Sequence, residues 1–111
     1  MGDRASISFS DGESESVTLF DHWGGEGLFE DALEYANKLV ATTSGTMEPL
    51  DRFEPNTVML DFITGHIKHP VRSRFYLGKT STDGDNSDNG HMKIIIDPRS
   101  RKVRNQKTRG E

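Results

Sequence analysis

Hydrophobic and polar side chains alternate in two short segments near the N-terminus. Between residues 4 and 10 the apolar positions are separated by serines, and between residues 15 and 20 Val17 and Leu19 continue the alternation after an Asp-Gly turn. A period of two is typical of strands that bury one face. The two segments therefore predict an antiparallel hairpin joined by a short polar loop.

In the middle of the chain the hydrophobic spacing changes to three and four. Residues 28–40 form an apolar stripe of this kind, and a second stripe begins after Pro55 and ends at Pro70. This spacing indicates two amphipathic helices, and proline suits the first turn of the second one. Residues 41–53, with several Thr, Ser and Gly, predict the loop between the helices.

Two further strands are predicted towards the C-terminus. Residues 72–79 alternate through Phe75 and Leu77, whereas residues 92–97 contain three consecutive isoleucines. Such a β-branched run indicates a strand that is buried on both faces, which is expected at the centre of a sheet. The polar residues 80–90 between the two strands predict a loop.

The order of these elements predicts a single α+β domain over residues 1–104. We expect a four-stranded, mainly antiparallel sheet in the order ββααββ, with both helices packed on one face as a second layer. A chain of 111 residues can bury one core of this kind without disulfides, and it contains no cysteine. Residues 105–111 predict a disordered basic tail, because they offer nothing apolar to bury.

Charge is distributed unevenly along the chain. Residues 99–111 hold six basic groups and one acidic group, a net of +5, whereas residues 1–98 hold eight basic and 17 acidic groups, a net of −9. An acidic body repels a nucleic-acid backbone, so the composition favours a protein partner, with nucleic-acid contact through residues 99–109 as the alternative. No apolar run is long enough to span a bilayer and no signal peptide is recognisable, so we expect a soluble, cytoplasmic protein without a membrane partner.

The predicted hairpin runs into the only tryptophan and a glycine cluster, directly before the first helix. Loop residues at a strand end often carry function, which makes this segment the first candidate for a binding site. Its members are Asp21, His22, Trp23, Gly24 and Gly25. We expect Trp23 to pack under the helix and the glycines to form a tight turn, because Glu26 and the lack of a phosphate-loop lysine oppose anion binding.

Histidines provide a second candidate site. His66 and His69 lie three residues apart near the end of the second predicted helix, where they could bind zinc with His91 or His22 as a third ligand. Such a centre could activate a water molecule for hydrolysis. The spacing is weakly specific and imidazoles also suit the C-terminal end of a helix dipole, so stabilisation of the helix end is the favoured interpretation.

The loop before the last predicted strand has the oxygen density of a calcium site. Asp83 and Asp85 belong to it, and positions 1, 3, 5 and 6 of an EF-hand are matched between Asp85 and Gly90. Position 12 falls on Ile96 instead of the required glutamate. A solvated loop without calcium is therefore the favoured interpretation.

Several of these segments together resemble a family of small phage-type proteins. The shared features are the N-terminal hairpin, the His22-Trp-Gly-Gly25 element, the helix that follows, and a late strand ending at Asp97. Similar proteins occur in phages, prophages and some bacterial and archaeal genomes. The resemblance covers residues 4–103 and implies a mobile-element setting. Because this family has no established activity, the resemblance implies no catalytic residue.

No segment of the sequence matches a catalytic or cofactor motif of high specificity. Our leading hypothesis is therefore a small non-enzymatic protein that binds another macromolecule through an acidic face near residues 22–27. The rival hypothesis is a metal-dependent hydrolase, which requires the four histidines to meet in one pocket. Nucleic-acid binding through the basic tail is a third hypothesis.

Overall fold

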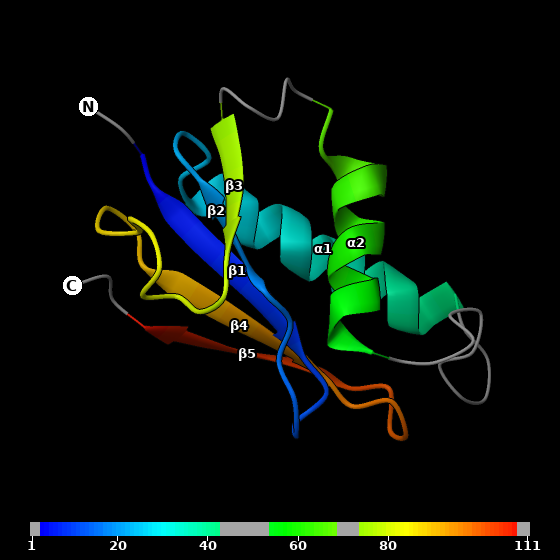
Figure 1. The fold of residues 1–111 in the computed structure, drawn as a ribbon. Coiled ribbons are helices and arrows are strands. Elements are labelled where there is room, and N and C mark those ends of the chain that lie inside the picture. The colour runs from blue at the N-terminus through cyan, green and yellow to red at the C-terminus, as the bar shows by residue number, and fades with distance from the viewer. Residues whose placement is uncertain (1–2, 43–53, 69–73, 109–111) are drawn as a thin grey trace.

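The computed structural model describes residues 3–42, 54–68 and 74–108. Within these ranges the strands form one five-stranded sheet, and both helices lie against the same face of it (Figure 1). The elements in chain order are β1 (Ala5–Ser10), β2 (Thr18–Asp21), α1 (Glu26–Thr42), α2 (Pro55–His66), β3 (Phe75–Gly78), β4 (His91–Ile96) and β5 (Val103–Thr108). The expected α+β class, with two helices beside one sheet, is confirmed.

The arrangement of the strands differs from the prediction. The sheet has the order β3-β2-β1-β4-β5, with β1 parallel to β4 and the other neighbouring pairs antiparallel. We predicted four mainly antiparallel strands, but the described residues contain five and form a mixed sheet. β2 covers one edge of β1, and β3 pairs with the outer edge of β2 instead of with β1. The second edge of β1 is therefore free to pair with β4, which runs parallel to β1.

The fifth strand uses residues that we expected to be disordered. Residues 103–108 pair with the whole of β4. The ammonium group of Lys107 lies 5.0 Å from the ring centre of Phe29, so the lysine stem covers part of the core. The domain boundary predicted at residue 104 lies inside β5, and the prediction of disorder directly after it is wrong. Residues 109–111 of the predicted tail lie outside the described residues.

The helices begin and end near the limits of their hydrophobic stripes. α1 starts two residues before the predicted stripe, because the glycine turn in front of it is very short. α2 starts at Pro55, where the missing N–H costs no helical hydrogen bond, and it ends at His66. Parts of three predicted segments lie outside the described residues: 43–53 of the interhelical loop, 69–70 after α2, and 72–73 before β3.

The core lies between the sheet and the helices. Alternate side chains of β1 and β4 point into it, and the rings of Phe9, Tyr35 and Phe62 pack there with centroids 5.5 to 5.8 Å apart. The three isoleucines at 94–96 are all buried, as predicted for a strand inside the sheet. The serines of β1 alternate with the core residues and therefore face the side of the sheet without helices.

Candidate functional site

The polar centre of the predicted binding segment is a buried ion pair. The Asp21 side chain is 1% exposed, and its two oxygens accept hydrogen bonds of 2.9 and 3.1 Å from the guanidinium of Arg74. Asp21 Oδ1 also accepts the backbone N–H of Trp23 at 3.0 Å. The hydrogen bonding that Arg74 donates to the Asp21 carboxylate raises the pKa of Arg74. Asp21 therefore ties the end of β2 to the residue before β3.

The two glycines are required by the turn that follows. A Cβ on Gly24 would overlap the carboxylate of Asp21, and one on Gly25 would overlap that of Asp3. Gly25 also has a φ of +56°, in the left-handed region that favours glycine. The N–H of Gly25 donates to the carbonyl of Asp3 at 2.8 Å, and that of Gly27 donates to the carbonyl of Gly24 at 3.1 Å. These amides are used inside the turn, which supports the tight-turn interpretation over an anion site.

The aromatic members of the segment lie nearer the surface. Trp23 is 57% exposed, so the prediction that it packs under α1 is wrong. Leu28 and Phe29 fill the buried position under the first turn of α1. They can do so because α1 begins at Glu26, directly after the glycine turn. His22 is half-buried, with its ring centre 5.1 Å from that of Tyr76. The corner is a structural turn that leaves one large apolar side chain exposed.

The described histidines are spread over the molecule. His66 packs on Tyr35 and Phe62 in the helical layer, with ring centroids 5.3 Å apart in each contact. His91 lies on the opposite face of the sheet, and His69 lies outside the described residues. In the part of the chain that the structure describes, no three His, Asp or Glu side chains are arranged to hold a metal ion. His66 and His91 therefore cannot share the single pocket that the hydrolase hypothesis requires, because the sheet lies between them.

The carboxylates of the predicted calcium loop bind to the protein itself. Asp83 accepts two backbone N–H groups at the start of the loop, at 2.6 and 3.0 Å. Asp85 and Asp88 both pair with Arg4, at 2.6 and 2.9 Å. Hydrogen bonds from Ser87 to Asp85, and from Arg4 to Asp88, lower the pKa values of these two carboxyl groups. These side chains close the turn and fasten the loop to the start of β1.

A buried polar cluster on the face of the sheet without helices was not predicted. Ser6 and Ser8 flank the imidazole of His91, with their Oγ atoms 2.8 Å from Nδ1 and 3.0 Å from Nε2. Asn86 Nδ2 donates to Ser6 Oγ at 2.8 Å, and Ser8 Oγ donates to Glu15 at 2.5 Å. The alternating serines were a signal for this face, but the parallel register that pairs Ser6 with His91 is needed to assemble the cluster.

One assignment of hydrogen-bond donors and acceptors gives each side chain of this cluster a partner. Asn86 donates to Ser6, whose hydroxyl donates to His91 Nδ1. His91 Nε2–H then donates to Ser8, which donates to Glu15. This assigns a neutral imidazole and agrees with the effect of burial, which lowers the pKa of His91. Both serines are fully buried and the Ser8 hydroxyl points to Glu15, so neither is presented to a substrate as a nucleophile.

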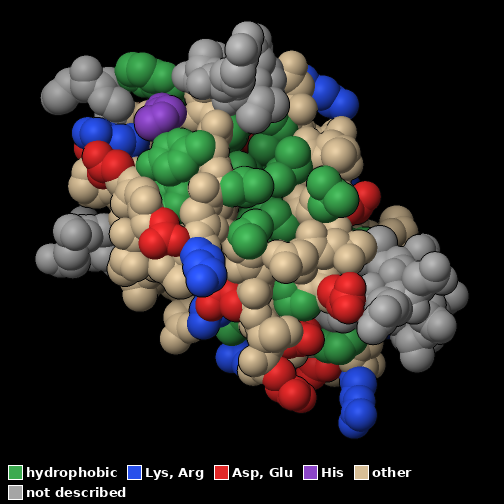
Figure 2. Space-filling view, viewed as in Figure 1, with side chains coloured by type: hydrophobic (Ala, Val, Ile, Leu, Met, Phe, Trp, Pro, Cys, Tyr) green, Lys and Arg blue, Asp and Glu red, His purple; other side chains and the backbone are tan. Residues whose placement is uncertain are grey.

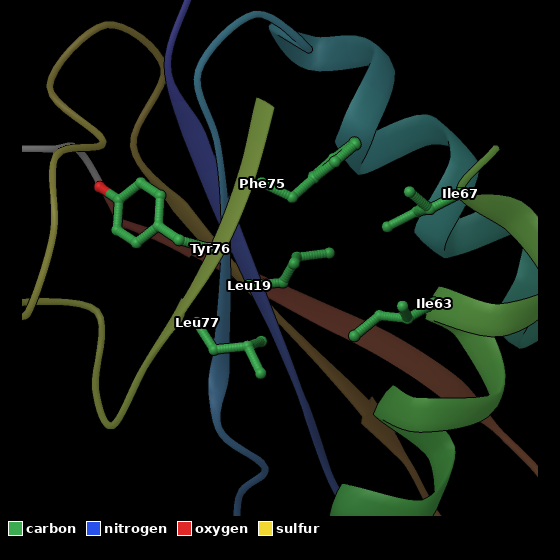
Figure 3. A pocket seen from close by; sticks show the side chains of 6 residues that line it. All are labelled: Leu19, Ile63, Ile67, Phe75, Tyr76 and Leu77. Carbon is green, nitrogen blue, oxygen red and sulfur yellow. The ribbon is translucent and has the colours of Figure 1, made fainter. Parts of the chain in front are cut away.

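An apolar groove lies between β3 and α2. It encloses about 110 Å³. Figure 3 shows side chains from β3 and β2 on one side of the groove, facing side chains from the end of α2 on the other. These side chains belong to Phe75, Leu77, Leu19, Ile63 and Ile67. The space-filling view shows apolar side chains gathered in the middle of this face of the molecule (Figure 2). The hydrophobic pattern marked these positions as apolar, but no feature of the sequence indicated that the space between them stays open.

The apolar surface continues beyond the groove. Leu77 is 56% exposed and Leu60 is 62% exposed. Leu60 precedes Ile63 by three residues and Ile67 by seven, so it lies on the same side of α2. Tyr76 also lines the groove, but its ring points away, to the other face of the sheet (Figure 3). The exposed leucines therefore extend the apolar surface along both β3 and α2.

Comparisons of the chain with protein-family models, with curated proteins and with solved structures found no significant match. The resemblance to small phage-type proteins therefore remains a prediction. Fold and site define the class of molecule instead: a small α+β domain with a mixed sheet and an apolar groove beside one edge of that sheet. No helix in the described ranges is long and apolar enough to cross a membrane.

Proposed function

We propose that this protein is a small non-enzymatic binding module that takes up a segment of a partner protein in the groove between β3 and α2. The groove is the observation that carries the proposal, because it combines an open apolar space of about 110 Å³ with exposed leucines on β3 and α2. An exposed apolar patch of this kind is typical of protein interaction sites.

The proposed docking surface borders the corner that the sequence indicated. The ring of His22 lies against Tyr76 of β3, and Arg74, which is bound to Asp21, immediately precedes β3. The proposal therefore keeps the protein partner and moves the main contact from the acidic corner to the apolar groove. The same corner carries the exposed side chain of Trp23.

The alternatives receive less support from the described residues. The Ser-His-Glu cluster offers no accessible nucleophile, because both of its serines are buried and the Ser8 hydroxyl is bonded to Glu15. In the basic C-terminal segment, Lys107 is paired with Glu26 at 3.2 Å, which removes one cation from any phosphate contact. The strand β5 also contains no aromatic side chain on which a base could stack.

Site-directed photo-crosslinking tests the proposed docking. Benzoylphenylalanine is introduced in place of Leu77 or Leu60, and in place of Glu34 on the exposed side of α1 as a matched control. In a lysate of the source cells, we expect one adduct of the same partner from positions 77 and 60 and none from position 34. The adduct from position 60 should be lost when Leu77→Asp is added. Equal labelling from all three positions, or none from either groove position, would refute docking in the groove.

A further inference from the structure

We infer that the partner segment binds as an extended strand added antiparallel to β3, with aliphatic side chains in the groove and an acidic residue at each of its ends. This inference rests on the proposed function and names the chemistry of the partner at the same site. Addition of a strand to an open sheet edge is a recurrent mode of peptide recognition.

The outer edge of β3 presents the backbone groups that such a strand needs. β3 is the last strand on its side of the sheet within the described residues. The backbone N–H of His22 donates to the carbonyl of Arg74 at 3.0 Å, which makes these residues a hydrogen-bonded pair of the β2–β3 ladder. Bonded pairs alternate along an antiparallel ladder. The backbone N–H and C=O groups of Tyr76 therefore point towards β2, whereas those of Phe75 and Leu77 point outward, away from the sheet.

An extended segment matches both the edge and the groove. It can bond Phe75 and Leu77, two residues apart, whereas a helix uses its own backbone groups internally. The residues opposite Phe75 and Leu77 in an added strand place their side chains on the same face as these two, over the groove. β3 contains four residues. An edge of that length extends about 14 Å and accommodates a core of about five residues.

Exposed lysines lie at both ends of the groove. Lys68 follows Ile67, which lies at the Phe75 end of the groove (Figure 3). Lys79 directly follows the last residue of β3, two positions after Leu77. Neither lysine forms an ion pair with another described residue. Cations at both ends favour a segment that carries an acidic residue at each end.

A second copy of the chain suits this edge less well. Two β3 strands in antiparallel pairing would bring Lys79 of one copy to the Phe75 end of the other, where Lys68 lies. Like charges would then meet at both ends of the new pair, which opposes its formation. The charge pattern therefore selects a partner of different sequence over self-association.

A blocked synthetic heptapeptide, Glu-Val-Thr-Val-Thr-Val-Glu, is the probe for this inference. Amide NMR of the full chain follows its binding, and we expect saturable shifts concentrated at Phe75, Leu77 and Ile63. Leu77→Asp should abolish them, and it should leave the fold intact because Leu77 is exposed. N-methylation of the valines should weaken binding about tenfold or more, because it removes the N–H groups that donate to β3.

Charge variants test the acidic ends of the segment. Replacing both glutamates of the peptide by lysines should weaken binding about fivefold at low salt. Lys79→Glu should weaken binding of the original peptide about threefold, whereas Lys102→Glu, before β5 at the other side of the sheet, should leave it unchanged. Equal binding of the acidic and basic peptides would overturn the inferred chemistry of the partner.

The remaining outcomes separate this inference from the proposed function. Undiminished binding of the N-methylated peptide, with the same groove shifts, would overturn strand addition while leaving docking in the groove intact. No shift at β3 with millimolar peptide would overturn the inference, and crosslinking from position 77 would still decide the proposed function independently. Concentration-dependent shifts of the same amides without peptide, together with a dimer in sedimentation, would make a second copy the occupant and also overturn it.

Discussion

Replacing Arg74 with methionine should leave the carboxylate of Asp21 buried without its cation. The Asp21 side chain is 1% exposed and, among the described residues, would keep the N–H of Trp23 as its one hydrogen-bond donor, at 3.0 Å. Breaking a buried ion pair on one side destabilises a protein by about 3–5 kcal/mol. Because the Arg74 side chain is 28% exposed, we expect the lower end of this range. A loss of about 3 kcal/mol lowers the melting temperature of a domain of this size by about 13 °C.

The partner substitution Asp21→Asn should have a smaller effect. Asparagine keeps an oxygen that accepts the N–H of Trp23, and the partly exposed Arg74 can be hydrated, so we expect a loss of about 1–2 kcal/mol. In the double variant no uncompensated charge remains in the interior. It should therefore be more stable than Arg74→Met alone by about 1 kcal/mol or more.

Urea unfolding of the four proteins, followed by circular dichroism, measures these free energies in one double-mutant cycle. The expected result is a coupling energy of at least about 1 kcal/mol between the two sites. Additive effects, or an Arg74→Met variant within about 0.5 kcal/mol of the original chain, would show that the ion pair does not hold β2 to the start of β3.

Three other parts of the structure make separate predictions. Gly24→Ala should lower the free energy of unfolding by about 2 kcal/mol in a thermal melt, because its Cβ would overlap the Asp21 carboxylate, whereas Gly27→Ala, where a Cβ meets no atom, should not destabilise the chain. Thr18→Val should raise it by about 1 kcal/mol in urea, since Thr18 Oγ1 is buried without a hydrogen-bond partner among the described residues, and a loss of stability would contradict this. Burial lowers the pKa of His91 from its ordinary value of 6.5, so the unfolded chain takes up this proton first as the pH falls. Stability should therefore be full above about pH 7 and decline below 6.5, and an equally steep decline in His91→Gln would refute this assignment.

Local hydrophobic patterns predicted the helices and strands of this fold better than they predicted which strands pair. The helices and β4 bury the apolar residues whose spacing predicted them. β1 and β2 bury both of their faces, including the serines that the alternation placed on the polar side. The direction of β4 beside β1 depends on where β3 docks, which is settled by packing between distant segments. β5 has one apolar residue, Val103, and depends on backbone hydrogen bonds to β4 that no local pattern contains.

The candidate sites show the same division. Gly24 and Gly25 were readable as a turn, but the exposure of Trp23 depends on the space that α1 fills with its own first apolar residues. Ile63 and Ile67 had the spacing of core positions, yet they line a groove because the short β3 does not cover them. The buried cluster around His91 depends on the register between β1 and β4. Features made within one segment were predictable, and those made between segments were not.

The central position of β1 imposes an order on folding. Its antiparallel neighbour β2 follows within the same hairpin, but its parallel neighbour is remote, and Ser6 meets His91 across 85 residues of chain. Closing so long a loop loses conformational entropy before the contacts of β4 can compensate, which slows the step. We therefore expect the hairpin of β1 and β2 to form early, and one edge of β1 to stay unpaired until β4 docks. In that partly folded state, and not in the native sheet, the central strand β1 can pair incorrectly with other strands.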